Sequence, residues 1–308
     1  MGLGGSKNSW QRQSKDFGHG QNMNRDQSTK YSCLVFDNRG VGESDKPLAL
    51  YSTSEMAKDT LQLVDHVGWT SNRQLHVIGV SMGGMIAQEL VRNPTIPLYL
   101  HPVFKKSVLI LQACMAAERI ASLSLVSTAP RLFNTVGFFE NLRNRADLFI
   151  PKSKDVELTN LKARIFSQAW LDEPDAEGHF PTNGDRFAAQ ELKKRQDTDG
   201  YTRTGFIRQA IAAGWHHKSP KQLEELGDRV GRERIQVVHG TLDRMITPPH
   251  GDLLFEGLGG KEKGVTMVVV EGKAHGLAME WRRDFTKLIG GFVEKTCVLI
   301  PTHRPHYL

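Results

Sequence analysis

Short, largely apolar runs alternate with longer polar stretches along this chain. The runs are YSCLVF (31–36), LHVIGV (75–80), SLSLVS (122–127), IQVVHG (235–240) and VTMVVVEG (265–272). Runs of this length without a strict polar alternation are typical of strands buried on both faces of a sheet. The pattern therefore predicts five buried strands.

Helical patterns lie between these runs. STSE (52–55) is a capping box, which predicts that a helix begins there. SMGGMIAQEL (81–90) follows the second run directly and reads as a helix, and residues 280–295 carry one apolar stripe at helical spacing. Because strands alternate with helices, we expect a mostly parallel α/β sheet with helices on both faces.

The segment between the third and fourth runs is too long for a connecting loop. Residues 128–234 are polar and rich in helical patterns, so they are predicted to form an inserted helical cap. The core would then consist of residues 1–127 and 235–295, and residues 296–308 would form an irregular tail.

Composition narrows the class of protein. The 308 residues carry a formal net charge of +6, and 39% of them are hydrophobic. Lys and Arg are mixed with Asp and Glu, as in KDVELTNLKAR (154–164), so we expect a solvated mixed-charge surface and no nucleic-acid partner. Cys33, Cys114 and Cys297 form no Cys-x-x-Cys pair, which argues against a disulfide framework and fits a reducing compartment.

The chain shows no membrane or secretory signal. Its start lacks a charged segment followed by an apolar one. The most apolar stretch (96–114) is interrupted by two prolines, a histidine and two lysines, so no transmembrane segment is expected. We therefore predict a cytoplasmic location.

The sharpest chemical signal is GVSMG (79–83), which stands between a predicted strand and a predicted helix. This is the G-x-S-x-G nucleophile elbow in its required context. Gly79 and Gly83 allow a tight turn that lifts the hydroxyl of Ser81 out of the sheet. The helix N-terminus below then offers free N–H groups to a developing negative charge.

A serine hydroxyl is a weak nucleophile and needs a base, which in turn needs an orienting partner. Asp243 follows the fourth predicted strand, and His275 follows the fifth. Both would lie at the carboxyl ends of parallel strands, where open α/β sheets bind their ligands. Ser81, Asp243 and His275 are therefore the predicted catalytic residues.

With these motifs, the chain resembles the α/β-hydrolase superfamily over residues 1–295. DNRGVGES (37–44), the Ser81 elbow and the loops of Asp243 and His275 carry the resemblance. It is most similar to the subgroup of enol-lactone hydrolases, carboxylesterases and carbon–carbon bond hydrolases, which share a Ser-Met-Gly-Gly elbow. The resemblance implies the α/β-hydrolase fold.

The resemblance also interprets the opening MGLGG. It is similar to the glycine-rich loop that supplies an oxyanion N–H in this superfamily, so Leu3 and Met82 are the predicted backbone donors. Residues 8–17 would form the helix that follows. The alternative is myristoylation of Gly2, since Met-Gly-x-x-x-Ser is also an acceptor pattern for that lipid. We favour the loop interpretation.

Two departures from the family pattern raise an alternative. The central strand that should precede the glycine-rich loop is absent, and residues 91–112 interrupt a helix as an atypical insertion. Both fit the hypothesis of a truncated or mis-spliced gene model. A second interpretation is that SVLILQA (107–113) replaces the absent strand.

The sequence thus predicts a serine hydrolase that cleaves a small or medium carboxylic ester or lactone through an acyl-enzyme. It needs no organic cofactor and no metal, and its partner is a small-molecule substrate. The alternative is a catalytically impaired hydrolase-fold protein that acts as a binding protein, or a non-functional fragment. The sequence names neither the substrate nor the oligomeric state.

Overall fold

The computed structural model describes residues 1–18, 31–91, 116–133, 135 and 153–300. The strands in these ranges are β1 (Leu75–Val80), β2 (Ile120–Val126), β3 (Ile235–Gly240) and β4 (Thr266–Val270). The helices of the core are η1 (Lys7–Trp10), α1 (Gln11–Gly18), α2 (Thr53–His66), α3 (Met82–Glu89), α4 (Ala116–Arg119), α10 (Pro220–Val230), η3 (Arg232–Arg234), α11 (Pro248–Gly257), α12 (Leu277–Glu280) and α13 (Arg282–Val298). Four further helices are α6 (Lys154–Ile165), α7 (Gln168–Asp172), α8 (Asn183–Gln196) and α9 (Arg203–Gly214), which we call the outer helices.

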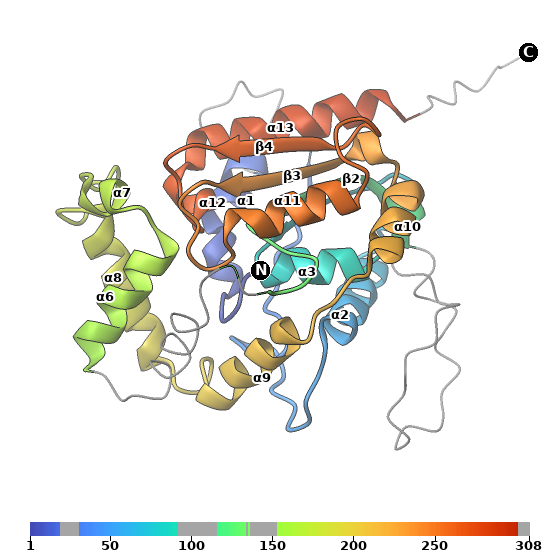
Figure 1. The fold of residues 1–308 in the computed structure, drawn as a ribbon. Coiled ribbons are helices and arrows are strands. Elements are labelled where there is room, and N and C mark those ends of the chain that lie inside the picture. Colours follow the sequence, from blue (N-terminus) through green and yellow to red (C-terminus); the bar gives the residue numbers. More distant parts are fainter. Residues whose placement is uncertain (19–30, 92–115, 134, 136–152, 301–308) are drawn as a thin grey trace, which may run out of the picture.

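A parallel sheet in the order β1-β2-β3-β4 lies at the centre of the molecule (Figure 1). Leu123 of β2 pairs with Ile235 of β3, and Val238 of β3 pairs with Val268 of β4. Every residue of β2 and β3 is buried, because these strands have neighbours on both sides and helices on both faces. The predicted parallel α/β sheet is confirmed.

Helices cover both faces of this sheet. α1 and α13 pack on one face, and α3, α10 and α11 on the other (Figure 1). Alternate residues of β2 serve the two faces: Leu123 and Leu125 join the core beneath α10 and α11, whereas Val126 joins the core beneath α13. α13 continues to Val298, so the predicted irregular tail begins later than residue 296, and residues 301–308 lie outside the described residues.

The prediction of a strand at residues 31–36 is wrong. This segment belongs to no strand, and β1 is one of the two edge strands of the described sheet, with β4 at the other edge. A cavity of about 610 Å³ is lined by both residues 31–36 and residues 74–78 of the β1 side. An apolar segment forms a strand only when a neighbouring backbone accepts and donates its hydrogen bonds, and no such partner is present among the described residues.

This cavity lies between residues 31–36 and β1. Its walls carry no Asp, Glu, Lys or Arg, and it is not lined by Ser81, Asp243 or His275. The predicted insertion at 91–112 begins just after α3, but residues 92–115 lie outside the described part of the chain.

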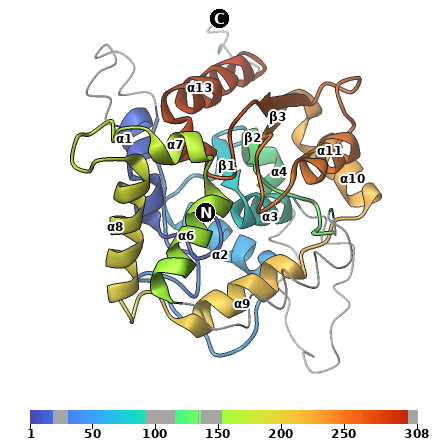
Figure 2. The same ribbon diagram turned by 60° about the vertical axis from the view of Figure 1, so that its left-hand side comes forward.

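The outer helices lie beyond the carboxyl ends of the strands (Figure 2). Phe166, Trp170 and Leu171 form a small apolar core of their own there. Ala212 and Ala213 of α9 share an apolar cluster with Met85 of α3, so α9 packs against the core. α10 packs directly on the sheet, because its Leu223 and Leu226 belong to the same core cluster as Leu123 and Leu125 of β2.

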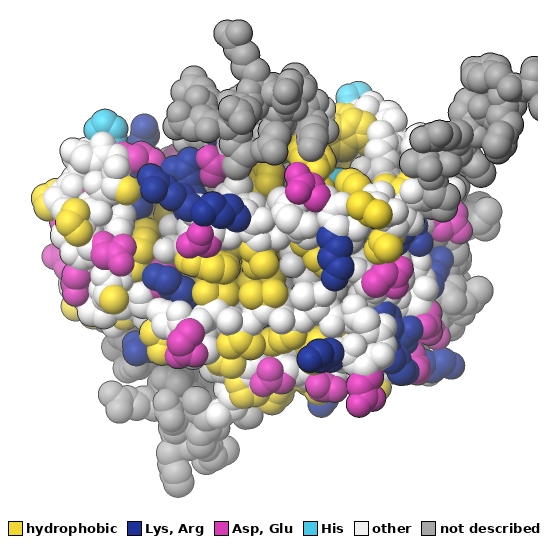
Figure 3. Space-filling model, turned by 90° about the horizontal axis from the view of Figure 1, so that it is seen from above, with side chains coloured by type: hydrophobic (Ala, Val, Ile, Leu, Met, Phe, Trp, Pro, Cys, Tyr) yellow, Lys and Arg dark blue, Asp and Glu magenta, His cyan; other side chains and the backbone are white. Residues whose placement is uncertain are grey.

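The described surface carries charges of both signs. On the face shown in Figure 3, basic and acidic side chains are interspersed around apolar patches. No helix among the described residues is long and apolar enough to cross a membrane.

Candidate active site

Ser81 occupies a sharp turn between β1 and α3. Its backbone has φ 57° and ψ −124°, a conformation that residues with a Cβ rarely adopt. The turn requires close backbone approach, since a Cβ on Gly79 would lie 2.5 Å from the carbonyl oxygen of Gly83. The carbonyl oxygen of Ser81 accepts hydrogen bonds from the Thr128 hydroxyl (2.7 Å) and the Gly84 N–H (2.9 Å). The strand, turn and helix of a nucleophile elbow are therefore present.

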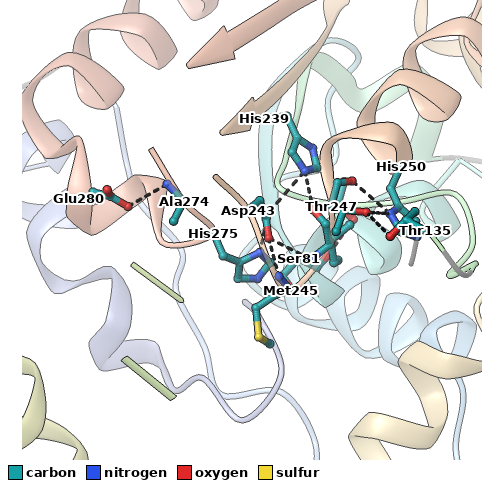
Figure 4. A network of polar contacts seen from close by, with 12 residues as sticks. Ser81, Thr135, His239, Asp243, Met245, Thr247, His250, Ala274, His275 and Glu280 are labelled. Atoms are coloured by element: carbon teal, nitrogen blue, oxygen red, sulfur yellow. Dashed lines mark hydrogen bonds and ion pairs between the residues drawn. The ribbon is translucent and has the colours of Figure 1, made fainter. Parts of the chain in front are cut away.

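Asp243 and His275 form a hydrogen-bonded pair. The His275 Nδ1 lies 2.8 Å from Oδ2 of Asp243, and the other carboxylate oxygen accepts N–H groups from Met245 (2.8 Å) and Ile246 (2.9 Å), as Figure 4 shows. An ionised carboxylate can only accept, so Nδ1 carries the proton and Nε2 is left as the basic nitrogen.

The environment of Asp243 keeps its carboxylate ionised. Burial by itself would raise its pKa, but the charge of His275 and hydrogen bonds from His239 and His275 lower the pKa of Asp243 to about 2. At neutral pH the carboxylate is negative, and it can stabilise a positive charge on His275.

Ser81 lies at the same edge of the sheet as this pair. Backbone hydrogen bonds continue across the carboxyl ends of the strands, from Ser81 N–H to Val126 (2.9 Å) and from Ser127 N–H to Val238 (2.9 Å). The described residues contain no hydrogen bond between the Ser81 hydroxyl and His275. Such contacts are often long without substrate and tighten when it binds.

The loop of residues 1–5 lies against the elbow. A Cβ on Gly2 would be 3.5 Å from Cβ of Ser81 and 3.9 Å from its Oγ. The Gly4 N–H donates to the buried side chain of Gln209 (2.8 Å), which holds the loop to α9. The first N–H groups of α3, that of Met82 among them, have no acceptor within their helix. The loop that contains Leu3 therefore lies against the turn that precedes Met82.

Three polar residues that sequence reasoning missed support these loops. Gln209 holds the glycine-rich loop, and Glu280 accepts a hydrogen bond from the Ala274 N–H (3.0 Å). The Nε2 of His239 donates to the Ile246 carbonyl (2.7 Å) and lies 3.4 Å from the Asp243 carboxylate. His239 stands in an apolar strand, where a histidine is more often a core residue, so only the folded chain reveals its contact with Asp243.

The described residues contain no group of three or more His, Cys, Asp or Glu side chains arranged to hold a metal ion. Arg39, in the DNRG turn, forms a two-point ion pair with Asp59, with contacts of 2.5 and 2.6 Å. It therefore braces the turn against α2.

Comparison with known proteins gives matches of two kinds. The family model described as the alpha/beta hydrolase fold matches residues 1–98. A Mycobacterium tuberculosis protein named as a non-heme bromoperoxidase, BpoC, is 33% identical over 153 residues. That match covers 49% of this chain and 48% of the relative, so it spans about half the length of the curated relative.

Solved structures resemble the chain over nearly its whole length. The BpoC crystal structure superposes with a TM-score of 0.64 at 18% identity and covers 96% of this chain and 90% of that one. An esterase from Exiguobacterium antarcticum gives 0.62 at 18% identity, covering 96% and 90%. The enol-lactonase of Burkholderia xenovorans LB400 gives 0.59 at 18% identity, covering 95% and 88%. At such identities the likeness concerns the fold.

Proposed function

Since this chain has the α/β-hydrolase fold, we propose that it is a serine hydrolase that acts on a small or medium carboxylic ester or lactone. One observation carries the proposal: a strained serine on a strand–helix elbow lies at the same sheet edge as a buried, hydrogen-bonded Asp–His pair. The esterase and enol-lactonase among the structural neighbours support the substrate class.

In the proposed mechanism, Ser81 attacks the carbonyl carbon of the substrate. His275 accepts the serine proton at Nε2 and passes it to the departing alcohol. Asp243 holds Nδ1–H and stabilises the imidazolium. The N–H groups of Leu3 and Met82 stabilise the negative oxygen, a contribution of some 3 kcal/mol for each donor. Water then attacks the acyl-enzyme by the reverse proton path.

The test is covalent labelling with a fluorophosphonate probe, which reacts only with an activated serine. We expect the chain to be labelled and its Ser81→Ala variant not to be. Ser127→Ala is a matched control, because Ser127 also follows a strand and has a positive φ of 45°. Labelling that persists in Ser81→Ala would refute the assignment. A folded chain that is never labelled would favour the non-catalytic alternative.

The name of the curated relative raises a second candidate, a peroxidase that acts on bromide. The test is an assay of bromide oxidation by hydrogen peroxide, carried out with the parent chain and with its Ser81→Ala variant. Bromination without ester cleavage would favour this candidate over the hydrolase.

A further inference from the structure

Glu280 is a buried acid close to the proposed catalytic histidine. It ends α12, five residues after His275, and its residue is only 6% exposed. One carboxylate oxygen accepts the Ala274 N–H at 3.0 Å. The other accepts the Ser167 N–H at 3.4 Å and the Ser167 hydroxyl. The carboxylate thus joins the residue before His275 to the turn between α6 and α7.

A second contact ties the residue after His275 to the same turn. The Gly276 N–H donates to the Ile165 carbonyl at 2.8 Å. A Cβ on Gly276 would lie 2.3 Å from the Phe166 ring, so only glycine allows this approach. His275 is therefore held on both sides by backbone that is bonded to the outer helices.

Burial of the Glu280 carboxylate costs free energy. A buried carboxylate loses its hydration, and only good hydrogen bonds compensate for that loss. The described structure gives Glu280 no ion-pair partner, so its three N–H and O–H donors carry that compensation. All three donors belong either to the histidine loop or to the turn at 165–167.

We propose that Glu280 is a positioning residue. It holds the loop of His275 so that the imidazole keeps its hydrogen bond to Asp243, and through Ser167 it links the orientation of His275 to the outer helices. The catalytic part of this inference rests on the proposed hydrolase function. The structural part, the orientation of His275, does not.

The first experiment measures the rate of fluorophosphonate labelling in four variants of the full chain. Glu280→Gln keeps the shape but offers one acceptor oxygen instead of two. Ser167→Ala removes the hydroxyl that donates to Glu280 but keeps the backbone contact, and Ser167→Thr retains a hydroxyl. Ser153→Ala is the matched control, because Ser153 caps α6 (accepting the Val156 N–H at 3.4 Å) as Ser167 caps α7, but does not contact the histidine loop.

We expect Glu280→Gln to label about 10- to 100-fold more slowly, since a displacement of the base by about 1 Å can cost that much. Ser167→Ala should label more slowly than the parent, Ser167→Thr should recover most of the rate, and Ser153→Ala should match the parent. Equal rates in Glu280→Gln and the parent would overturn the proposal. So would an equal slowing in Ser153→Ala and Ser167→Ala, because a lost helix cap alone would then explain it.

The second experiment does not depend on catalysis. The proton on Nδ1 of His275 has its own NMR signal, whose position reports the hydrogen bond to Asp243. In Glu280→Gln we expect this signal to shift or to broaden by exchange with water, and in Ser153→Ala to stay unchanged. If the parent is never labelled but the signal responds, the hydrolase proposal fails and the positioning role stands. An unchanged signal in Glu280→Gln overturns the positioning role.

Discussion

At the scale of one residue, the strained backbone of Ser81 shows how much conformational free energy the elbow costs. With φ 57° and ψ −124°, it holds a conformation that costs on the order of 1–3 kcal/mol for a residue with a Cβ. The surrounding contacts, among them the Thr128 hydroxyl on the Ser81 carbonyl, hold the turn in place. A replacement without a Cβ would relieve the strain.

Ser81→Gly should therefore be more stable than the parent by about 1 kcal/mol, after allowance for the greater chain entropy of glycine. Urea unfolding at neutral pH measures this change. Ser81→Ala is the control, because alanine meets the same strain and should gain nothing. Equal stabilities of the glycine and alanine variants would contradict the idea that the turn is strained.

Asp243 predicts a dependence of stability on pH. Its folded pKa of about 2 lies below its ordinary value of 3.8, so the ionised form stabilises the fold. That contribution, about 2 kcal/mol, is fully present above about pH 4 and is lost as the pH falls from about 4 through 2.

The measurement compares the free energy of unfolding of the parent and of Asp243→Asn across that range of pH. The parent should be the more stable protein at pH 7, and the difference should shrink as the pH approaches 2. A difference that is constant with pH would mean that Asp243 has an ordinary pKa in the folded chain.

At the scale of the element, a sequence motif predicts a helix or strand reliably when all the groups that stabilise the element lie within the motif. The capping box predicted at 52–55 is present in both halves: the Glu55 N–H donates to the Ser52 hydroxyl (3.3 Å), and the Ser52 N–H donates to the Glu55 carboxylate (2.8 Å). The run at 235–240 forms β3 with the predicted bounds. The run at 31–36 has similar composition but no neighbour to pair with, so it forms no strand.

Loss of the Ser52 cap should lower the stability of the protein, because it leaves N–H groups at the start of α2 without an acceptor. We expect Ser52→Ala to lower the midpoint of urea unfolding, by about 1 kcal/mol in stability, and Ser52→Gly to cost only a few tenths. Thermal or urea unfolding of the two variants tests this. An equal loss in both would indicate that packing of the side chain, and not the cap, is responsible.

At the scale of the whole molecule, the alternation of strands and helices predicted the parallel sheet. It also predicted that Asp243 and His275 lie at one edge of the sheet, because each follows a parallel strand and the carboxyl ends of such strands meet there. It could not predict the contacts of Glu280, His239 or Gln209. Each of these depends on segments far apart in the chain, such as Ser167 and Glu280, that only the folded chain joins. The family resemblance supplied Leu3, which no local pattern would single out.

The edge of the described sheet leads to a prediction for hydrogen exchange. β1 pairs only with β2 among the described residues, and its other side borders the cavity of about 610 Å³. Amide groups of β1 that point away from β2, and those of residues 31–36, should exchange faster than the amides of β3, which has a neighbour on each side. Equal protection of β1 and β3 would mean that another backbone pairs with β1 in solution.

The hydrogen bonds between Ser167 and Glu280 also limit how this architecture can be recombined. An insertion between two strands is usually treated as an exchangeable module, to be swapped between relatives in chimeric proteins. Here the exchanged piece would take Ser167 with it and leave Glu280 behind. A chimera should therefore keep the native conformation of its histidine loop only if the incoming helices place a hydrogen-bond donor against the Glu280 carboxylate. Positions 167 and 280 must then be exchanged together.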